Sequence, residues 1–108
     1  MPSDESDLPL ACNFDAIPAD ERESHQALSA QLFGTVMETE ALSDGYGFRL
    51  PSDSATLRQV VDFVANERLC CPFLRFEMVV EPGSRALWLR LSGQAGVRQF
   101  LEAEILSH

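Results

Sequence analysis

The clearest periodic run of apolar side chains lies between residues 52 and 71. Its apolar positions, at spacings of three and four residues, are Leu57, Val60, Val61 and Val64. This spacing places them on one face of an α-helix. Ser52, Asp53 and Ser54 offer N-cap side chains at the start. Pro72 limits the far end, because the residue before a proline avoids helical geometry, and a helix is therefore predicted between these signals.

Two weaker patterns also predict helices. Residues 18–32 start with Pro18, which suits a first helical turn, and carry acidic side chains near that end. Residues 94–106 present one apolar side, as a helix packed on a core does. That side is formed by Val97, Phe100, Leu101 and Ile105.

Short segments separated by turn signals are predicted to be β-strands. They are residues 8–14, 33–42, 46–50, 73–80 and 86–91. Pro9 places the first of them at a strand start or a sheet edge. The second alternates apolar and polar residues, as a half-exposed strand does. Ser43-Asp44-Gly45 predicts a hairpin turn, and residues 81–84, Glu-Pro-Gly-Ser, predict another.

The order of elements is strand, helix, two strands, helix, two strands, helix. Hairpins mixed with helices predict an α+β fold, a two-layer sandwich with an antiparallel sheet of about five strands and helices on one face. The first six elements match the order of a ferredoxin-like split β-α-β motif. Residues 1–7 are expected to be a mobile tail, and residues 8–108 a single α+β domain.

Composition narrows the class of protein. A chain of 108 residues, 45% hydrophobic and 23% charged, has the size and profile of one globular domain. No apolar run approaches the ~20 residues that span a bilayer. The polar, acidic start differs from a basic, apolar secretory signal, so a cytoplasmic location is expected. Thiols stay reduced there, and an odd count of three cysteines argues against a disulfide framework.

The charge balance excludes several functions. The net charge is −9, from 17 acids and 8 bases, so nucleic acid and anionic membrane are not expected partners. Every base is an arginine. Schiff-base chemistry and a Walker-type phosphate loop are excluded because both need a lysine.

The most informative residues are two adjacent cysteines, Cys70 and Cys71, directly before Pro72. If the helix continues that far, its phase turns Cys71 toward the core and Cys70 toward the helix flank. Glu67 precedes them by three and four residues, within side-chain reach. Arg68 is predicted on the core-facing stripe, where its charge needs a carboxylate partner or a path to solvent.

Several kinds of chemistry are open to these thiols. A nucleophile is disfavoured, because the C-terminal end of a helix opposes a thiolate. A closed zinc site is weakly signalled, because its paired cysteines are normally two to four residues apart. A soft ion such as copper(I), mercury(II) or arsenic(III) accepts two or three thiolates more readily. Cys12 would supply the third only if the fold brings it near.

The simplest alternative is packing. Buried free cysteine behaves as a small apolar residue, and Cys12 and Cys71 could fill core space. A thiol oxidoreductase is a further alternative, in which mild oxidation joins Cys12 to Cys70 or Cys71. His25, at the edge of the apolar face of the first helix, is expected to be a packed or solvated residue, and terminal His108 is expected to be mobile.

The stretch from residue 67 to residue 76 also carries a resemblance. It reads Glu67-Arg68-Leu69-Cys70-Cys71-Pro72-Phe73-Leu74-Arg75-Phe76. It resembles a small bacterial family with the signature Glu-Arg-x-Cys-Cys-Pro-Phe-x-x-Phe, and the likeness extends from residues 10–12 to the closing helix. The resemblance implies no defined reaction. It implies a loose association with heavy-metal resistance, with Cys12, Cys70 and Cys71 as shared thiols and Glu67 and Arg68 beside them.

The sequence therefore favours thiol-dependent binding of a soft metal or metalloid ion. Cys70 and Cys71 would supply thiolates and Cys12 a third; Arg68 would compensate charge, oriented by Glu67, with His25 as a supporting residue. No catalytic residue is assigned. The rival hypothesis is a non-catalytic structural or protein-interaction module, a homodimer formed through an exposed sheet edge.

Overall fold

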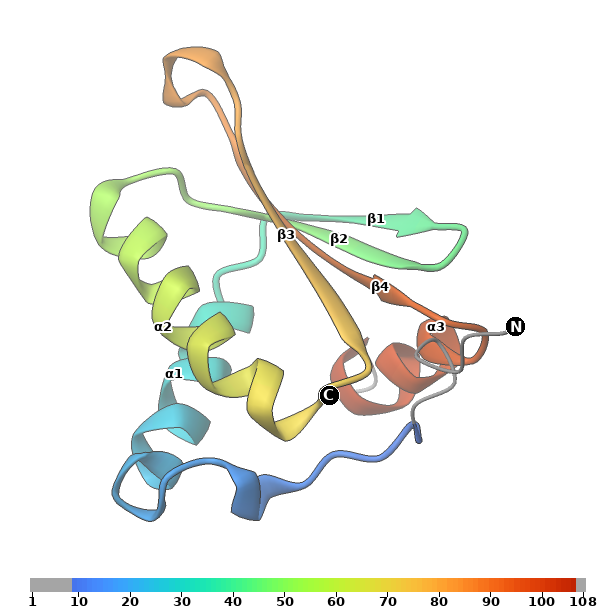
Figure 1. Cartoon of the computed structure of the whole chain (residues 1–108). Helices are drawn as coiled ribbons and strands as arrows, with labels where there is room; N and C mark the ends of the chain where they lie inside the picture. The colour runs from blue at the N-terminus through green and yellow to red at the C-terminus, as the bar shows by residue number, and fades with distance from the viewer. Residues whose placement is uncertain (1–8, 107–108) are drawn as a thin grey trace.

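The computed structural model describes residues 9–106 of the chain. The tail predicted over residues 1–7, and His108, lie outside the described residues. Pairs of strands follow the first two helices, and a third helix ends the series (Figure 1). In chain order the elements are α1 Arg22–Phe33, β1 Glu38–Leu42, β2 Gly45–Leu50, α2 Ser54–Cys70, β3 Leu74–Val80, β4 Leu87–Gly93 and α3 Val97–Leu101. A π-helical turn, Glu102–Leu106, continues α3. Short 3₁₀ turns cover Phe14–Ala16, Ala19–Glu21 and Pro82–Ser84.

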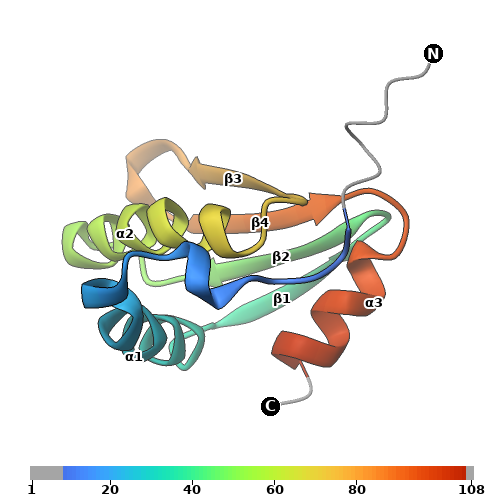
Figure 2. The ribbon, with the colours of Figure 1, turned by 60° about the horizontal axis from the view of Figure 1, so that its bottom comes forward.

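The strands form one antiparallel sheet in the order β1-β2-β4-β3. Each hairpin, β1–β2 and β3–β4, contributes one central and one edge strand. The helices lie on one face of this sheet (Figure 2). The predicted two-layer α+β class and the antiparallel sheet are confirmed; the count of about five strands is wrong, because the described residues form four.

The missing strand is the one predicted over residues 8–14. Its described part, from Pro9 on, runs on the helix side of the molecule, away from the sheet (Figure 1, blue). The Asn13 amide donates a hydrogen bond to the Cys70 carbonyl, 2.7 Å away, so this segment pairs with the end of a helix. The Asn13 side chain then accepts from the Asp15 amide and starts a 3₁₀ turn. Without this strand the ferredoxin-like start is also wrong.

The segment predicted as a strand over residues 33–42 is shorter in the structure. Helix α1 includes Phe33, whose ring contacts Phe48 and Phe63 edge-on at centroid distances of 5.2 and 5.4 Å. Strand β1 begins only at Glu38. Phe33 therefore packs into the core from a helix. The alternation of apolar and polar residues along the chain could not show whether Phe33 belongs to a helix or to a strand.

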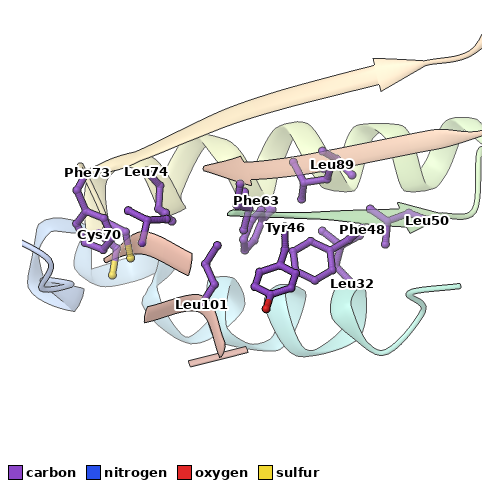
Figure 3. Packing of buried hydrophobic residues seen from close by; sticks show 14 of the residues in the cluster. Leu32, Tyr46, Phe48, Leu50, Phe63, Cys70, Phe73, Leu74, Leu89 and Leu101 are labelled. Carbon is purple, nitrogen blue, oxygen red and sulfur yellow. The ribbon is translucent and has the colours of Figure 1, made fainter. Parts of the chain in front are cut away.

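Buried side chains of β2 and β4 face the helices. Phe48, Leu87, Leu89 and Leu91 are almost fully buried, whereas Trp88 and Arg90, on the other face of β4, are half-buried. This is the period-two alternation of a sheet covered on one side. Figure 3 shows Phe48 and Leu89 of these strands packed with Leu32, Phe63 and Leu101 of the helices.

Helix α2 follows the predicted boundaries closely. The Asp53 carboxylate accepts a hydrogen bond from the Thr56 amide at 3.1 Å, which confirms an N-cap in the predicted Ser-Asp-Ser segment. The buried face, however, contains Val60, Phe63 and Cys70, while Val61 is 52% exposed. The predicted apolar stripe therefore identifies the helix correctly, but it wrongly includes Val61 among the buried residues.

Replacing Leu89 by alanine tests this core. Leu89 is fully buried in the central strand β4, so Leu89→Ala should lower the free energy of unfolding by about 2–5 kcal/mol. The control is Val61→Ala, an aliphatic truncation on the exposed side of α2, which should change it by less than about 0.5 kcal/mol. Urea unfolding followed by circular dichroism measures both; similar losses in the two variants would contradict the described core.

Candidate metal and thiol site

Three cysteine sulfurs converge at the C-terminal end of α2. Cys70 is the last helical residue and Cys71 is its C-cap. Cys12 arrives from the extended segment that the Asn13–Cys70 hydrogen bond fixes beside this helix end. The sulfur atoms of all three lie within 4.8 Å of one another. The condition on which the sequence-based hypothesis depended, that Cys12 should meet the cysteine pair, is fulfilled by the fold.

The local backbone explains why both tandem side chains reach the cluster. The Cys71 amide still donates to the Glu67 carbonyl at 2.8 Å, but its own φ and ψ, −122° and 74°, leave the helix. Pro72 favours such an extended conformation in the residue before it. The Leu74 amide then donates to the Cys71 carbonyl at 3.1 Å as the chain turns into β3. Cys70 and Cys71 are both buried as a result.

Two of the three sulfurs are bonded to each other. Cys12 and Cys71, 59 residues apart in the chain, form a disulfide, and Cys70 is free and buried. The expectation of three free thiols is wrong for this state of the protein. The count and the inferred compartment could not reveal the bond, because it depends on how the fold places two distant segments. Because the number of cysteines is odd, one thiol, that of Cys70, stays free.

A buried histidine–carboxylate pair adjoins the sulfurs. Nε2 of His25, from α1, lies 2.8 Å from Oε1 of Glu67 in α2, and the His25 side chain is only 4% exposed. The imidazole ring stacks on Phe63 with a centroid distance of 5.6 Å. The other oxygen of Glu67, Oε2, lies 3.5 Å from the Cys71 sulfur. When Cys71 is reduced, its thiol can donate a hydrogen bond to this carboxylate.

Burial and charge keep the free thiol protonated. Burial raises the pKa of Cys70 above the ordinary cysteine value, and the negative charge of Glu67 raises it further. Both effects disfavour an isolated thiolate. An unpaired anionic nucleophile is therefore disfavoured at this position, and a cation that bound to the sulfur would have to displace the proton.

Arg68 does not occupy the position predicted for it. Its residue is exposed, and its Nε donates to the Ala65 carbonyl at 3.2 Å. Arg68 lies about 200° around the helix axis from Cys70, so burying Cys70 turns the guanidinium outward. The prediction of a core-facing Arg68 is wrong.

A groove opens beside the cluster. It has a volume of about 740 Å³ and lies between α1 and the turn Glu102–Leu106, over β1 and β2. Its wall includes the thiol of Cys70, the imidazole of His25 and the carboxylates of Glu67 and Glu104. Figure 3 shows the Cys70 side chain at one end of the packed cluster, away from Phe48.

Sequence reasoning identified the three cysteines, Glu67 and His25 as separate candidates, but it missed the groove and the contact between His25 and Glu67. These two residues are 42 positions apart on different helices. The packing of α1 against α2 creates the contact, and no local pattern signals it. Comparison with known proteins gives no family: no protein-family model, curated protein or solved structure matches the chain. Among residues 9–106, no helix combines the length and apolarity needed to cross a membrane.

The reactivity of Cys70 should depend on pH in a specific way. In the disulfide form it is the one free thiol of the chain, so alkylation by iodoacetamide reports on it alone. The rate should rise with pH through a midpoint above the ordinary thiol pKa, because burial and Glu67 disfavour the thiolate. Glu67→Gln removes the neighbouring charge and should lower that midpoint.

The matched control is Glu23→Gln, which neutralises an exposed acid in the first turn of α1 and should leave the midpoint where it is. Stopped reactions analysed by mass spectrometry measure the rates. An unchanged midpoint in Glu67→Gln, with the fold intact by circular dichroism, would contradict the electrostatic account.

Proposed function

We propose that the reduced protein binds one soft metal or metalloid ion through the sulfurs of Cys12, Cys70 and Cys71. The observation that supports this proposal is the convergence of the three sulfurs within 4.8 Å. Soft thiolate ligands select thiophilic ions, whereas magnesium and calcium require oxygen ligands. A three-sulfur set suits arsenic(III), mercury(II) or copper(I).

The donor set also argues against a closed structural zinc site. Such a site needs four protein ligands. Within residues 9–106, the cluster that could hold an ion contains the three cysteines and no histidine or carboxylate. The imidazole of His25 is close by, but its Nε2 is hydrogen-bonded to Glu67. A three-coordinate ion is therefore the better match.

Glu67 and His25 would support the ligands rather than bind the ion. The Glu67 carboxylate lies 3.5 Å from the Cys71 sulfur and can accept the proton that this thiol loses on binding. His25 holds the other carboxylate oxygen in place from the neighbouring helix. Outer-shell partners of this kind orient ligands and tune their basicity. Arg68 has no such role in the proposal, because its side chain turns away.

The disulfide would control loading of the site. With Cys12 and Cys71 bonded to each other, only Cys70 remains as a thiol. Reduction restores all three ligands. The proposal therefore places the active form in a reducing compartment, and the cytoplasm is the proposed location. The resemblance to the bacterial family described above, with its association with heavy-metal resistance, also supports metal binding.

Arsenite is the probe that tests this proposal. Arsenous acid should react once with the reduced protein, three thiols forming three arsenic–sulfur bonds and releasing three water molecules. One equivalent should therefore remove all three thiols detected by a chromogenic disulfide reagent. Serine at any one of the three positions should weaken binding roughly tenfold or more, since ligand loss costs at least as much as loss of a supporting contact.

Glu23→Gln serves again as the control and should bind like the parent protein. Native mass spectrometry should show one ion per protein, and sedimentation velocity would show any dimer as a doubled mass. Retention of all three free thiols in the presence of excess arsenite would end the proposal.

The disulfide itself favours a second candidate, thiol–disulfide exchange. Cys12 belongs to an exposed segment while Cys71 is buried, so an external thiol can attack the Cys12 sulfur. That attack forms a mixed disulfide and releases the Cys71 thiol beside Glu67. A second external thiol then displaces Cys12, leaving a reduced protein and one small-molecule disulfide.

Equilibration in glutathione redox buffers tests this candidate. The protein should gain two hydrogens in a single reversible transition, measured by mass after acid quenching. Cys70→Ser should keep the transition and Cys12→Ser should lose it, because the bond joins Cys12 and Cys71. Loss of the transition in Cys70→Ser would overturn the assigned pairing. A two-electron transition without arsenite binding would favour the redox function over the metal function.

The proposed homodimer has its own supporting surface. A hollow of about 290 Å³ lies between α2 and β3, with Arg68 at its border. Around it Val61 and Met78 are 52% and 44% exposed. Because β3 is an edge strand, a second copy could cover this strip. The doubled sedimentation mass mentioned above would show it.

A further inference from the structure

We infer that the metalloid centre taken by this site carries an apolar organic group, and that the groove beside Cys70 holds that group. The inference rests on the proposed function and names its ligand class: monoorganyl arsenic(III) compounds. A bare ion bound by three sulfurs occupies the sulfur cluster alone. The groove has a volume of about 740 Å³, which lies within the range of small-molecule sites.

The groove is connected to the cluster through one sulfur. Of the three cysteines, only Cys70 belongs to the groove wall. An arsenic atom bonded to Cys70 and to one more sulfur of the cluster keeps its third bond for carbon. That substituent would extend from Cys70 into the groove, while the metalloid stays with the sulfurs.

The lining suits an apolar substituent. Its apolar members are the rings and aliphatic side chains of Phe14, Phe33, Val36, Phe48 and Ile105, together with Ala30. Phe33 is already part of an edge-to-face pair with Phe48, at 5.2 Å. Aromatic faces and edges of this kind pack well against a further ring. The helical turn that carries Ile105 and the helix that carries Phe33 would enclose the group from two sides.

The charges of the lining select against the alternative occupants. The described wall contains Glu67 and Glu104 and no arginine. Carboxylate-bearing thiols or disulfides would meet like charge there. A neutral aryl or alkyl arsenic(III) compound meets none of this repulsion, and it loses only water when it bonds to thiols.

His25 supplies an independent sign that the groove takes a ligand. Its ring lines the groove, its residue is 5% exposed, and its Nδ1 is buried with no hydrogen-bond partner. If Nε2 donates to Glu67 in a neutral ring, the acceptor lone pair of that ring is on Nδ1. Buried polar atoms are nearly always paired in folded proteins. A hydroxyl on arsenic, present until the second thiol displaces it, is a donor of the right kind.

The chemistry balances without a redox step. Phenylarsonous acid, the hydrated form of phenylarsine oxide, reacts first with the Cys70 thiol to form one arsenic–sulfur bond and release one water. A second cysteine thiol displaces the remaining hydroxyl and releases a second water. Arsenic stays trivalent, the carbon–arsenic bond stays intact, and the third cysteine remains free.

Two tryptophan variants of α1 provide the test. Ala30 lines the groove, whereas Ala27, three residues earlier and also exposed, does not. Ala30→Trp should fill the groove and weaken phenylarsine oxide binding by roughly tenfold or more, the loss of one well-packed apolar group. Ala27→Trp should leave it unchanged. Arsenite binding should be the same in both variants, which also shows that each has folded.

Affinities are measured on the reduced proteins by competition with a small dithiol, and free thiols are counted at saturation. Phenylarsine oxide should leave one thiol free and arsenite none. If Ala30→Trp affects neither compound, the groove does not hold the organic group and the inference fails while the metal function stands. If neither compound binds the parent protein, the proposed function fails first.

Discussion

The site depends on how helix α2 ends. Cys70 closes the helix, Cys71 leaves it, and Pro72 prevents its continuation. The carbonyl of Cys70 is thereby available to the Asn13 amide, 2.7 Å away. This one backbone hydrogen bond ties an otherwise unpaired segment to the helix end and brings Cys12 to the other sulfurs. The disulfide and the three-sulfur cluster depend on this placement of Cys12.

The same helix end organises the electrostatics. Glu67 lies one turn before the cysteines, and its two oxygens approach His25 at 2.8 Å and the Cys71 sulfur at 3.5 Å. Together with burial, its negative charge raises the Cys70 pKa, so this thiol resists ionisation. In the proposed function, a soft cation would take the place of the thiol protons.

Local patterns predicted most of the fold. Helix α2, the two hairpins and the one-sided sheet follow from periodicity, turn residues and caps, which depend on neighbours in sequence. The strand expected over residues 8–14 did not form, because the Asn13 amide bonds to a helix carbonyl, which is a long-range contact. The candidate residues were identified individually, because adjacent cysteines can be seen directly in the amino-acid sequence. The pairing of Cys12 with Cys71, the His25–Glu67 contact and the outward Arg68 depend on how α1 and α2 pack, which no local signal encodes.

Arsenic K-edge X-ray absorption of the reduced protein, loaded with one equivalent of arsenite, tests the central claim most directly. It reports the atoms bound to the metalloid without relying on variants. If the three sulfurs form one ligand set, arsenic should have three sulfur neighbours and no oxygen neighbour. A first shell that keeps oxygen, with one sulfur or none, would contradict the account.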